Sequence, residues 1–126
     1  THNYNDGVRS TIQDIYSKMF NVIVQTNKII AHAEADGGAF PDEATRSVIL
    51  GEAYAIRAYC QLDVLRLFGE VPGGDGEKVS LPYSEVKAFD ERATRYDFSG
   101  YAEKLLTDLK RAEDLLKDND PIFQYI

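Results

Sequence analysis

The amino-acid sequence predicts an all-α fold: a single helical domain over residues 1–126, built from long antiparallel helix hairpins with one long irregular loop. Apolar residues recur every three or four positions in three separate stretches of the chain. Glycine and proline stand at the ends of these stretches, and turn-forming residues are concentrated in one region between them. A chain of 126 residues is also long enough to bury one core without disulfides.

The first predicted helix begins at Val8 and ends at Gly37 and Gly38, because glycine readily adopts the positive φ of a helix C-terminus. The residues before Val8 are expected to form a segment that precedes this helix. Its apolar stripe consists of Ile12, Ile15, Met19, Ile23, Thr26, Ile30 and Ala33.

The second predicted helix opens at Pro41 and Asp42, since proline is tolerated in a first helical turn and aspartate complements the helix dipole. Gly69 and Pro72 end it. It contains the segment GEAYAIRAYCQLDVLRLFGEVP at residues 51–72, and its apolar stripe consists of Ile49, Ala53, Ile56, Cys60, Val64 and Leu67.

Small residues of the second helix predict close packing on more than one side. Ala53 lies on the apolar stripe, whereas Ala55 and Ala58 lie beside it, so neighbouring helices can approach over a wide arc.

Charged residues border the same stripe. Glu52 and Asp63 fall at its edge, where a buried carboxylate needs a partner, and Arg57 and Arg66 can supply one. We interpret these as structural charges; a functional site is the alternative.

Residues 73–96 hold short alternations and several turn formers, which predicts a long irregular loop. A third helix is expected from about Phe98, with Asp97 as its N-cap, and it stops at Asn119–Pro121. Tetratricopeptide arrays share this organisation of long helix hairpins, although their repeat of about 34 residues is not clearly present here. The apolar positions of this helix are Phe98, Tyr101, Leu105, Leu109, Ala112 and Leu116.

Composition argues against several classes of function. The chain has 14 Lys and Arg against 21 Asp and Glu, a formal charge of -7 that disfavours nucleic acid as a partner. His2 and His32 lack metal-ligand spacing, and Cys60 on an apolar stripe is interpreted as a buried, inert thiol. The glycine-rich run at residues 73–78 follows a helix, unlike a phosphate-binding loop, so we interpret it as a turn. We therefore expect no enzyme activity, metal or cofactor.

The chain contains the motifs NKII at 27–30, the segment at 51–72, LPY at 81–83 and YAEKLLTDLKRAEDLL at 101–116. In their order and separation these motifs resemble those of the SusD/RagB family, the surface glycan-binding lipoproteins of the Bacteroidetes. The similarity is carried by Gly51, Glu52, Ala53, Arg57, Ala58, Phe68, Gly69, Val71 and Pro72, and by Asp108, Leu109, Ala112 and Glu113.

The resemblance implies a tetratricopeptide-like fold in a protein anchored by lipid to the outer membrane, which passes oligosaccharides or other nutrients to a TonB-dependent transporter. Family members are several hundred residues long, so this chain corresponds to an N-terminal portion that lacks the lipidated cysteine. Family sugar sites also frequently use tryptophan, and this sequence has none.

Aromatic side chains on exposed segments are the candidate sugar-binding residues, because aromatic faces stack on the apolar faces of sugar rings. Tyr4, with Asn3 and Asp6 beside it, is the first candidate, and Tyr83 in the long loop is the second. The alternative is that these aromatics pack on the helices. A helical-repeat interaction scaffold without a small ligand is the other function considered. Core or helix contacts are predicted for Tyr16, Phe20, Tyr54, Tyr59, Phe68 and Tyr101.

Overall fold

The computed structural model describes residues 2–35, 40–68 and 80–119, without the side chains of residues 2–5 and 68. Most of these residues are helical, which is compatible with the predicted all-α class. The helices are α1 (His2–Ala35), α2 (Glu43–Phe68) and α3 (Phe98–Leu116). A two-stranded antiparallel ribbon, β1 (Leu81–Pro82) and β2 (Arg95–Tyr96), precedes α3.

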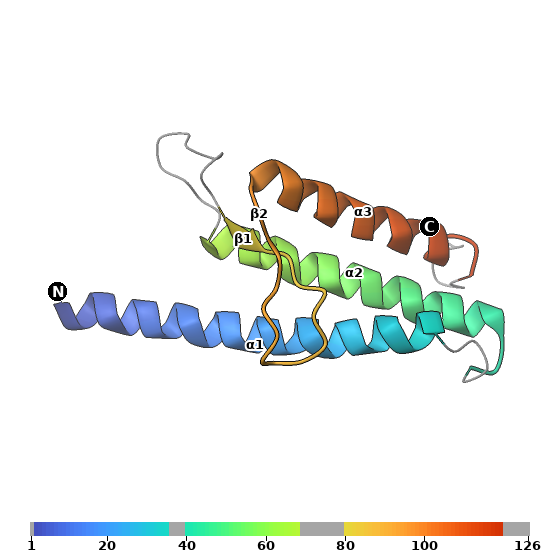
Figure 1. The fold of residues 1–126 in the computed structure, drawn as a ribbon, viewed down its shortest axis with the longest axis horizontal. Coiled ribbons are helices and arrows are strands. Elements are labelled where there is room, and N and C mark those ends of the chain that lie inside the picture. Colours follow the sequence, from blue (N-terminus) through green and yellow to red (C-terminus); the bar gives the residue numbers. More distant parts are fainter. Residues whose placement is uncertain (1, 36–39, 69–79, 120–126) are drawn as a thin grey trace.

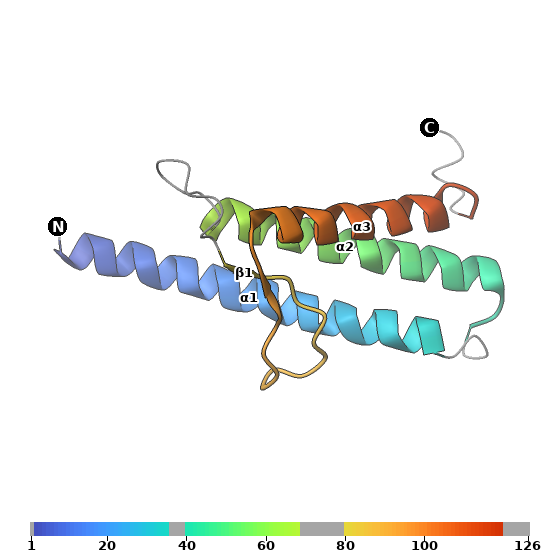
Figure 2. The ribbon, with the colours of Figure 1, turned by 45° about the horizontal axis from the view of Figure 1, so that its top comes forward.

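The three helices lie side by side, with α2 between α1 and α3 (Figures 1 and 2). The chain direction reverses from each helix to the next (Figure 1). The segment that joins β1 to β2 crosses α1 in both views (Figures 1 and 2). A central α2 thus contacts a helix on either side.

Helix α1 begins earlier than the sequence analysis predicts. Asn3, Tyr4 and Asp6 belong to α1, which starts at His2, and do not form a segment before it. The prediction depended on apolar periodicity, which starts at Val8, whereas backbone hydrogen bonding continues into polar turns that face solvent. The prediction for Gly37 and Gly38 lies outside the described residues.

Helix α2 begins at Glu43, so Pro41 and Asp42 lie just before its first turn and not within it as predicted. The Asp42 carboxylate accepts a hydrogen bond of 2.6 Å from the backbone N–H of Thr45, and this contact with backbone N–H groups lowers the pKa of Asp42. Gly69 and Pro72, the expected end of α2, lie outside the described residues.

The predicted stripe of α2 is partly wrong. Ile56 and Leu67 are 46 % and 37 % exposed. Because apolar and charged residues are mixed around α2 and it touches two helices, periodicity alone does not identify its buried side. Its buried residues are Ser47, Leu50, Gly51, Ala53, Tyr54, Arg57, Ala58, Gln61 and Val64.

Helix α3 begins as predicted. Asp97 is its N-cap, and the carboxylate accepts a hydrogen bond of 2.8 Å from the Gly100 N–H. Tyr101 and Ala112 are buried, but Phe98 and Leu109 are 49 % and 43 % exposed, contrary to the predicted stripe.

Small residues let the helices approach closely. Ala53 and Ala58 are both buried, as the sequence analysis expects. At Gly51, an added Cβ would lie 2.8 Å from Leu116 Cγ and 3.0 Å from Leu115 Cβ on α3. The main apolar cluster includes Ile30, Ala33, Leu50, Ala53, Tyr54 and Ala112.

The predicted loop is ordered over its second part. Leu81 pairs with Tyr96, and Pro82 with Arg95, which forms the ribbon. Leu81, Tyr83 and Tyr101 form a second apolar cluster, so this segment packs onto the helices. The prediction of an irregular loop is therefore confirmed for residues 83–94 and wrong for the four residues of the ribbon, and residues 73–79 lie outside the described residues.

Candidate functional site

A buried ion pair joins the helices. Arg57 of α2 donates two hydrogen bonds, of 2.7 and 2.8 Å, to the two carboxylate oxygens of Asp108 on α3. The side chains of Arg57 and Asp108 are only 5 % and 3 % exposed. Burial disfavours the charged guanidinium, but hydrogen bonding and attraction from Asp108 outweigh it and raise the pKa of Arg57. Arg57 is thus a structural charge, as the sequence predicts, but its partner is Asp108 of α3 and neither Glu52 nor Asp63.

The other charges flanking the predicted stripe lie at the surface. Glu52 is exposed, so its predicted place at a buried edge is wrong. Asp63 and Arg66 lie 3.7 Å apart with side chains 47 % and 72 % exposed, an arrangement that contributes little stability.

Tyr83 is not an exposed loop aromatic. Its side chain is 1 % exposed, and its hydroxyl donates to the Asp108 carboxylate. Burial and this hydrogen bond raise the pKa of Tyr83 well above its usual range. The ring also meets that of Tyr101 edge to face, with centroids 5.2 Å apart. Tyr83 therefore packs on the helices, which was the alternative prediction, and its side chain offers no surface to a ligand.

Two amide side chains attach the ribbon segment, residues 80–96, to the helices. Asn27 donates to the carbonyls of Ser84 and Val86 at 3.0 and 2.8 Å. Gln61 donates to the Pro82 carbonyl at 3.1 Å and accepts from the Ser84 N–H at 2.8 Å. These contacts hold Pro82 and the residues after it in place.

The sequence analysis did not identify Asn27 and Gln61 as residues that fix the ribbon segment. Their position among the apolar residues of a predicted helix is the signal that could have identified them. Asn27 also accepts a hydrogen bond of 3.0 Å from Arg57, and Gln61 donates one of 2.7 Å to the Tyr101 hydroxyl. Within the described part of the chain, every buried polar side-chain atom has a hydrogen-bond partner. The buried network is therefore satisfied internally and stabilises the fold.

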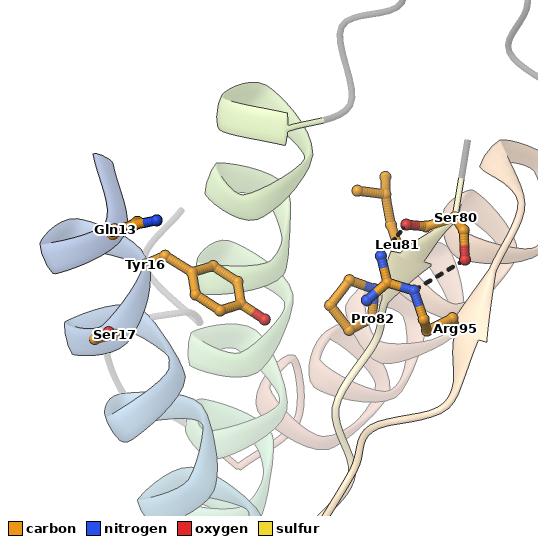
Figure 3. Close-up of a pocket in the computed structure, with 7 residues that line it drawn as sticks. All are labelled: Gln13, Tyr16, Ser17, Ser80, Leu81, Pro82 and Arg95. Atoms are coloured by element: carbon orange, nitrogen blue, oxygen red, sulfur yellow. Dashed lines mark hydrogen bonds between the residues drawn. The ribbon is translucent and has the colours of Figure 1, made fainter. Parts of the chain in front are cut away.

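An open groove lies where α1 faces the ribbon, and it is the candidate functional site (Figure 3). Its volume is about 580 Å³. The Tyr16 ring projects from α1 towards Pro82 on β1 (Figure 3). The remaining lining residues are Gln13, Ser17, Ser80, Leu81 and Arg95.

Local contacts fix the polar side of the groove. Arg95 donates from Nε to the Ser80 hydroxyl at 2.9 Å and from Nη2 to the Ser80 carbonyl, so its guanidinium is held against β1 (Figure 3). Burial raises the pKa of the half-buried Tyr16, and the positive charge of Arg95 partly opposes this change. Tyr16 therefore presents a neutral phenol in the physiological pH range.

The predicted site residues do not gather at this groove. Asp6 lies ten positions before Tyr16 on the same helix, a distance of about 15 Å at 1.5 Å per residue. The side chains of Asn3 and Tyr4 lie outside the described residues. The groove was missed because helical spacing alone predicts that Tyr16 is a core residue.

The structure agrees with some of the other aromatic predictions and contradicts one of them. Tyr54 and Tyr101 are buried as expected, and Tyr16 and Phe20 are partly buried. Tyr59 is 70 % exposed, so its predicted core position is wrong. The side chain of Phe68 lies outside the described residues.

Cys60 is half-buried, in part as predicted. Burial and the negative charge of Asp63 raise the pKa of its thiol, which keeps it protonated at neutral pH. Among the described residues, no group of three His, Cys, Asp or Glu is placed to hold a metal ion. None of the described helices is long and apolar enough to span a membrane.

Comparison with known proteins returns no matching family model and no significant match to a curated protein.

Proposed function

We propose that this chain is the tetratricopeptide-like N-terminal portion of a SusD/RagB-type lipoprotein. In this proposal the protein lies at the cell surface, anchored to the outer membrane by a lipid outside this chain. It captures oligosaccharide for a TonB-dependent, SusC-like transporter. Two sets of observations support the proposal: the order of the sequence motifs, and three long helices that reverse direction in succession (Figure 1).

The groove between α1 and the ribbon is the single observation that carries the proposal. Its volume of about 580 Å³ falls within the range of small-ligand sites. It combines an aromatic ring, from Tyr16, with amide, hydroxyl and guanidinium groups on the surrounding elements.

This combination suits a sugar ring. The C–H face of a sugar stacks on an aromatic ring, while the hydroxyls at its edge need hydrogen-bond donors and acceptors. Gln13 and Ser17 lie one turn apart around Tyr16, and Arg95 carries guanidinium donors across the groove. Neutral polar groups dominate this lining, which favours an uncharged oligosaccharide.

The test is binding of this chain, and of the full-length precursor, to an array of neutral oligosaccharides. Tyr16→Ala should abolish the carbohydrate signal, and Gln13→Ala should weaken it. Tyr59→Ala is the matched control, because Tyr59 is an exposed helical tyrosine on α2 that does not line the groove. Circular dichroism checks that each variant remains folded. Equal loss of signal in the Tyr16 and Tyr59 variants would contradict a site in the groove.

A helical-repeat interaction scaffold is the second candidate. Exposed apolar residues on α1 and α2, among them Val22 and Ile56, favour a protein partner. This function predicts no carbohydrate signal from either the chain or the precursor, so the same array distinguishes the two candidates.

A further inference from the structure

Helix α2 keeps an apolar surface on the side that no described element covers. It packs against α1, α3 and the ribbon segment, yet Ile56 and Tyr59 are 46 % and 70 % exposed, and Leu67 is 37 % exposed. Adjoining exposed apolar side chains mark interaction sites. This remaining side of α2 is therefore a candidate contact surface.

Helix α1 carries a matching column of exposed apolar residues at intervals of seven. Val8, Ile15, Val22 and Ile29 are each between 41 % and 48 % exposed. A spacing of seven residues corresponds to nearly two turns, so the four side chains form a line along one side of the helix. At 1.5 Å per residue, this line is about 32 Å long.

The apolar columns of α1 and α2 adjoin. Ile29 and Ile49 line the same surface depression. Because α1 and α2 run in opposite directions (Figure 1), this surface continues backwards along α1 to Val22 and forwards along α2 to Ile56, both of which are exposed. We call this surface the outer face; its apolar residues are Val8, Ile15, Val22, Ile29, Ile49, Ile56 and Leu67, and the carboxylates of Glu52 and Asp63 lie within about 40° of Ile56 on the same side of α2.

The ribbon leaves the outer face open. On α1, Asn27 binds the ribbon segment and lies about 160° around the helix from Ile29, at 100° per residue. On α2, Gln61 binds the ribbon and lies about 140° from Ile56 by the same count. The outer face therefore points away from both the ribbon and the groove.

We propose that the outer face binds a second copy of this chain, so that α1 and α2 of two copies form a four-helix contact. The parts of α1 and α2 that line the outer face are about 32 and 27 Å long, so at about 9 Å of width per helix they present about 530 Å², roughly two thirds of the roughly 800 Å² that each partner buries in a standard interface. A single helix column would present only about half of this area.

A second copy presents the same two helices. The seven-residue period is confined to α1, because the residue seven positions after Ile56 on α2 is the half-exposed Asp63. A two-fold axis brings such a surface onto itself, which is the commonest geometry of homodimers. The N-terminal part of α1 also extends beyond the end of α2 (Figure 1). An isolated helical extension is only marginally stable in water, so an opposing helix would stabilise it.

Light scattering coupled to size exclusion tests the proposal on this chain across a wide range of concentration. The expected species has twice the 14.2 kDa mass of one chain, and salt should favour it by screening the charge of -7 on each copy. Val22→Glu or Ile56→Glu should weaken dimerisation by roughly tenfold or more while helix content stays unchanged.

Leu106→Glu is the matched control, because Leu106 is 64 % exposed on α3, outside the outer face. It should leave the dimer intact. A wild-type chain that is monomeric at every concentration would overturn the proposal, as would equal weakening by Leu106→Glu and Val22→Glu. Neither result bears on glycan binding, which depends on the groove on the other side of α1.

Discussion

Replacing Asp108 with asparagine should strongly destabilise the protein. The substitution keeps the shape of the side chain but removes its negative charge, so the Arg57 guanidinium stays buried at 5 % exposure without a counter-ion. It also replaces one of the two carboxylate oxygens that accept from Arg57 with an amide N–H₂ group. The Tyr83 hydroxyl, which donates to the same carboxylate, competes for the acceptor that remains.

The magnitude follows from the geometry of the pair. Breaking a buried ion pair by neutralising one partner typically costs about 3 to 5 kcal/mol, because the remaining charge is desolvated without compensation. Domains of this size have a total stability of only about 5 to 15 kcal/mol. At about 4 °C per kcal/mol, Asp108→Asn should lower Tm by about 12 to 20 °C.

Urea unfolding followed by circular dichroism measures this difference, and Asp63→Asn is the matched control. Asp63 is likewise a helical aspartate next to an arginine, but its pair with Arg66 is 3.7 Å long and mostly exposed, so its loss should cost less than about 1 kcal/mol. Equal midpoints and m-values for the two variants would refute the reasoning, because the free energy of unfolding lost with each aspartate charge would then not depend on burial.

Three further outcomes are expected. Gly51→Ala should destabilise the protein by about 1 to 3 kcal/mol in thermal unfolding, because its Cβ would overlap Leu116, and a wild-type Tm would contradict this contact. Tyr83→Ala should lower the free energy of unfolding by about 3 to 5 kcal/mol because Tyr83 is buried, whereas Glu52→Ala should lower it by less than about 0.5 kcal/mol because Glu52 is exposed. Urea unfolding measures both values, and a larger loss for Glu52→Ala would contradict these positions. Burial and hydrogen bonding to Glu34 raise the pKa of Tyr54 from 10.0 to about 12, so its contribution to stability is fully present below pH 10 and is lost as pH rises through 12. The tyrosinate absorbance of Tyr54 should therefore rise as the protein unfolds. If Tyr54 lost its proton near pH 10 while the protein stayed folded, its ionisation would not be coupled to unfolding.

Local sequence signals predicted the helix starts well where a side chain caps the backbone. Asp97 caps α3 and Asp42 precedes α2, and both act through a carboxylate that accepts from the first turn. Ala53 and Ala58 were predictable contacts because small side chains leave room for a neighbour whichever helix supplies it.

The long-range contacts could not be predicted in this way. The partner of Arg57 is 51 positions away, and nothing in the sequence near Arg57 identifies Asp108. Tyr83 was expected at the surface because it lies between helices, but the ribbon returns it to the core, where it packs against Tyr101. The exposure of Ile56 could not be predicted because apolar and charged residues are mixed around α2, so its periodicity contains little information.

The groove escaped prediction because it forms only when α1 and the ribbon are held together, and the buried network holds them. Pro82 lines the groove, and its carbonyl accepts from Gln61, while the neighbouring Tyr83 donates to Asp108. Loosening the network would therefore move Pro82 relative to Tyr16 without removing any residue that lines the groove. Loss of glycan binding in Asp108→Asn would then reflect altered positioning of the ribbon, and only a variant such as Gln13→Ala, which changes the lining and not the network, reports direct contact.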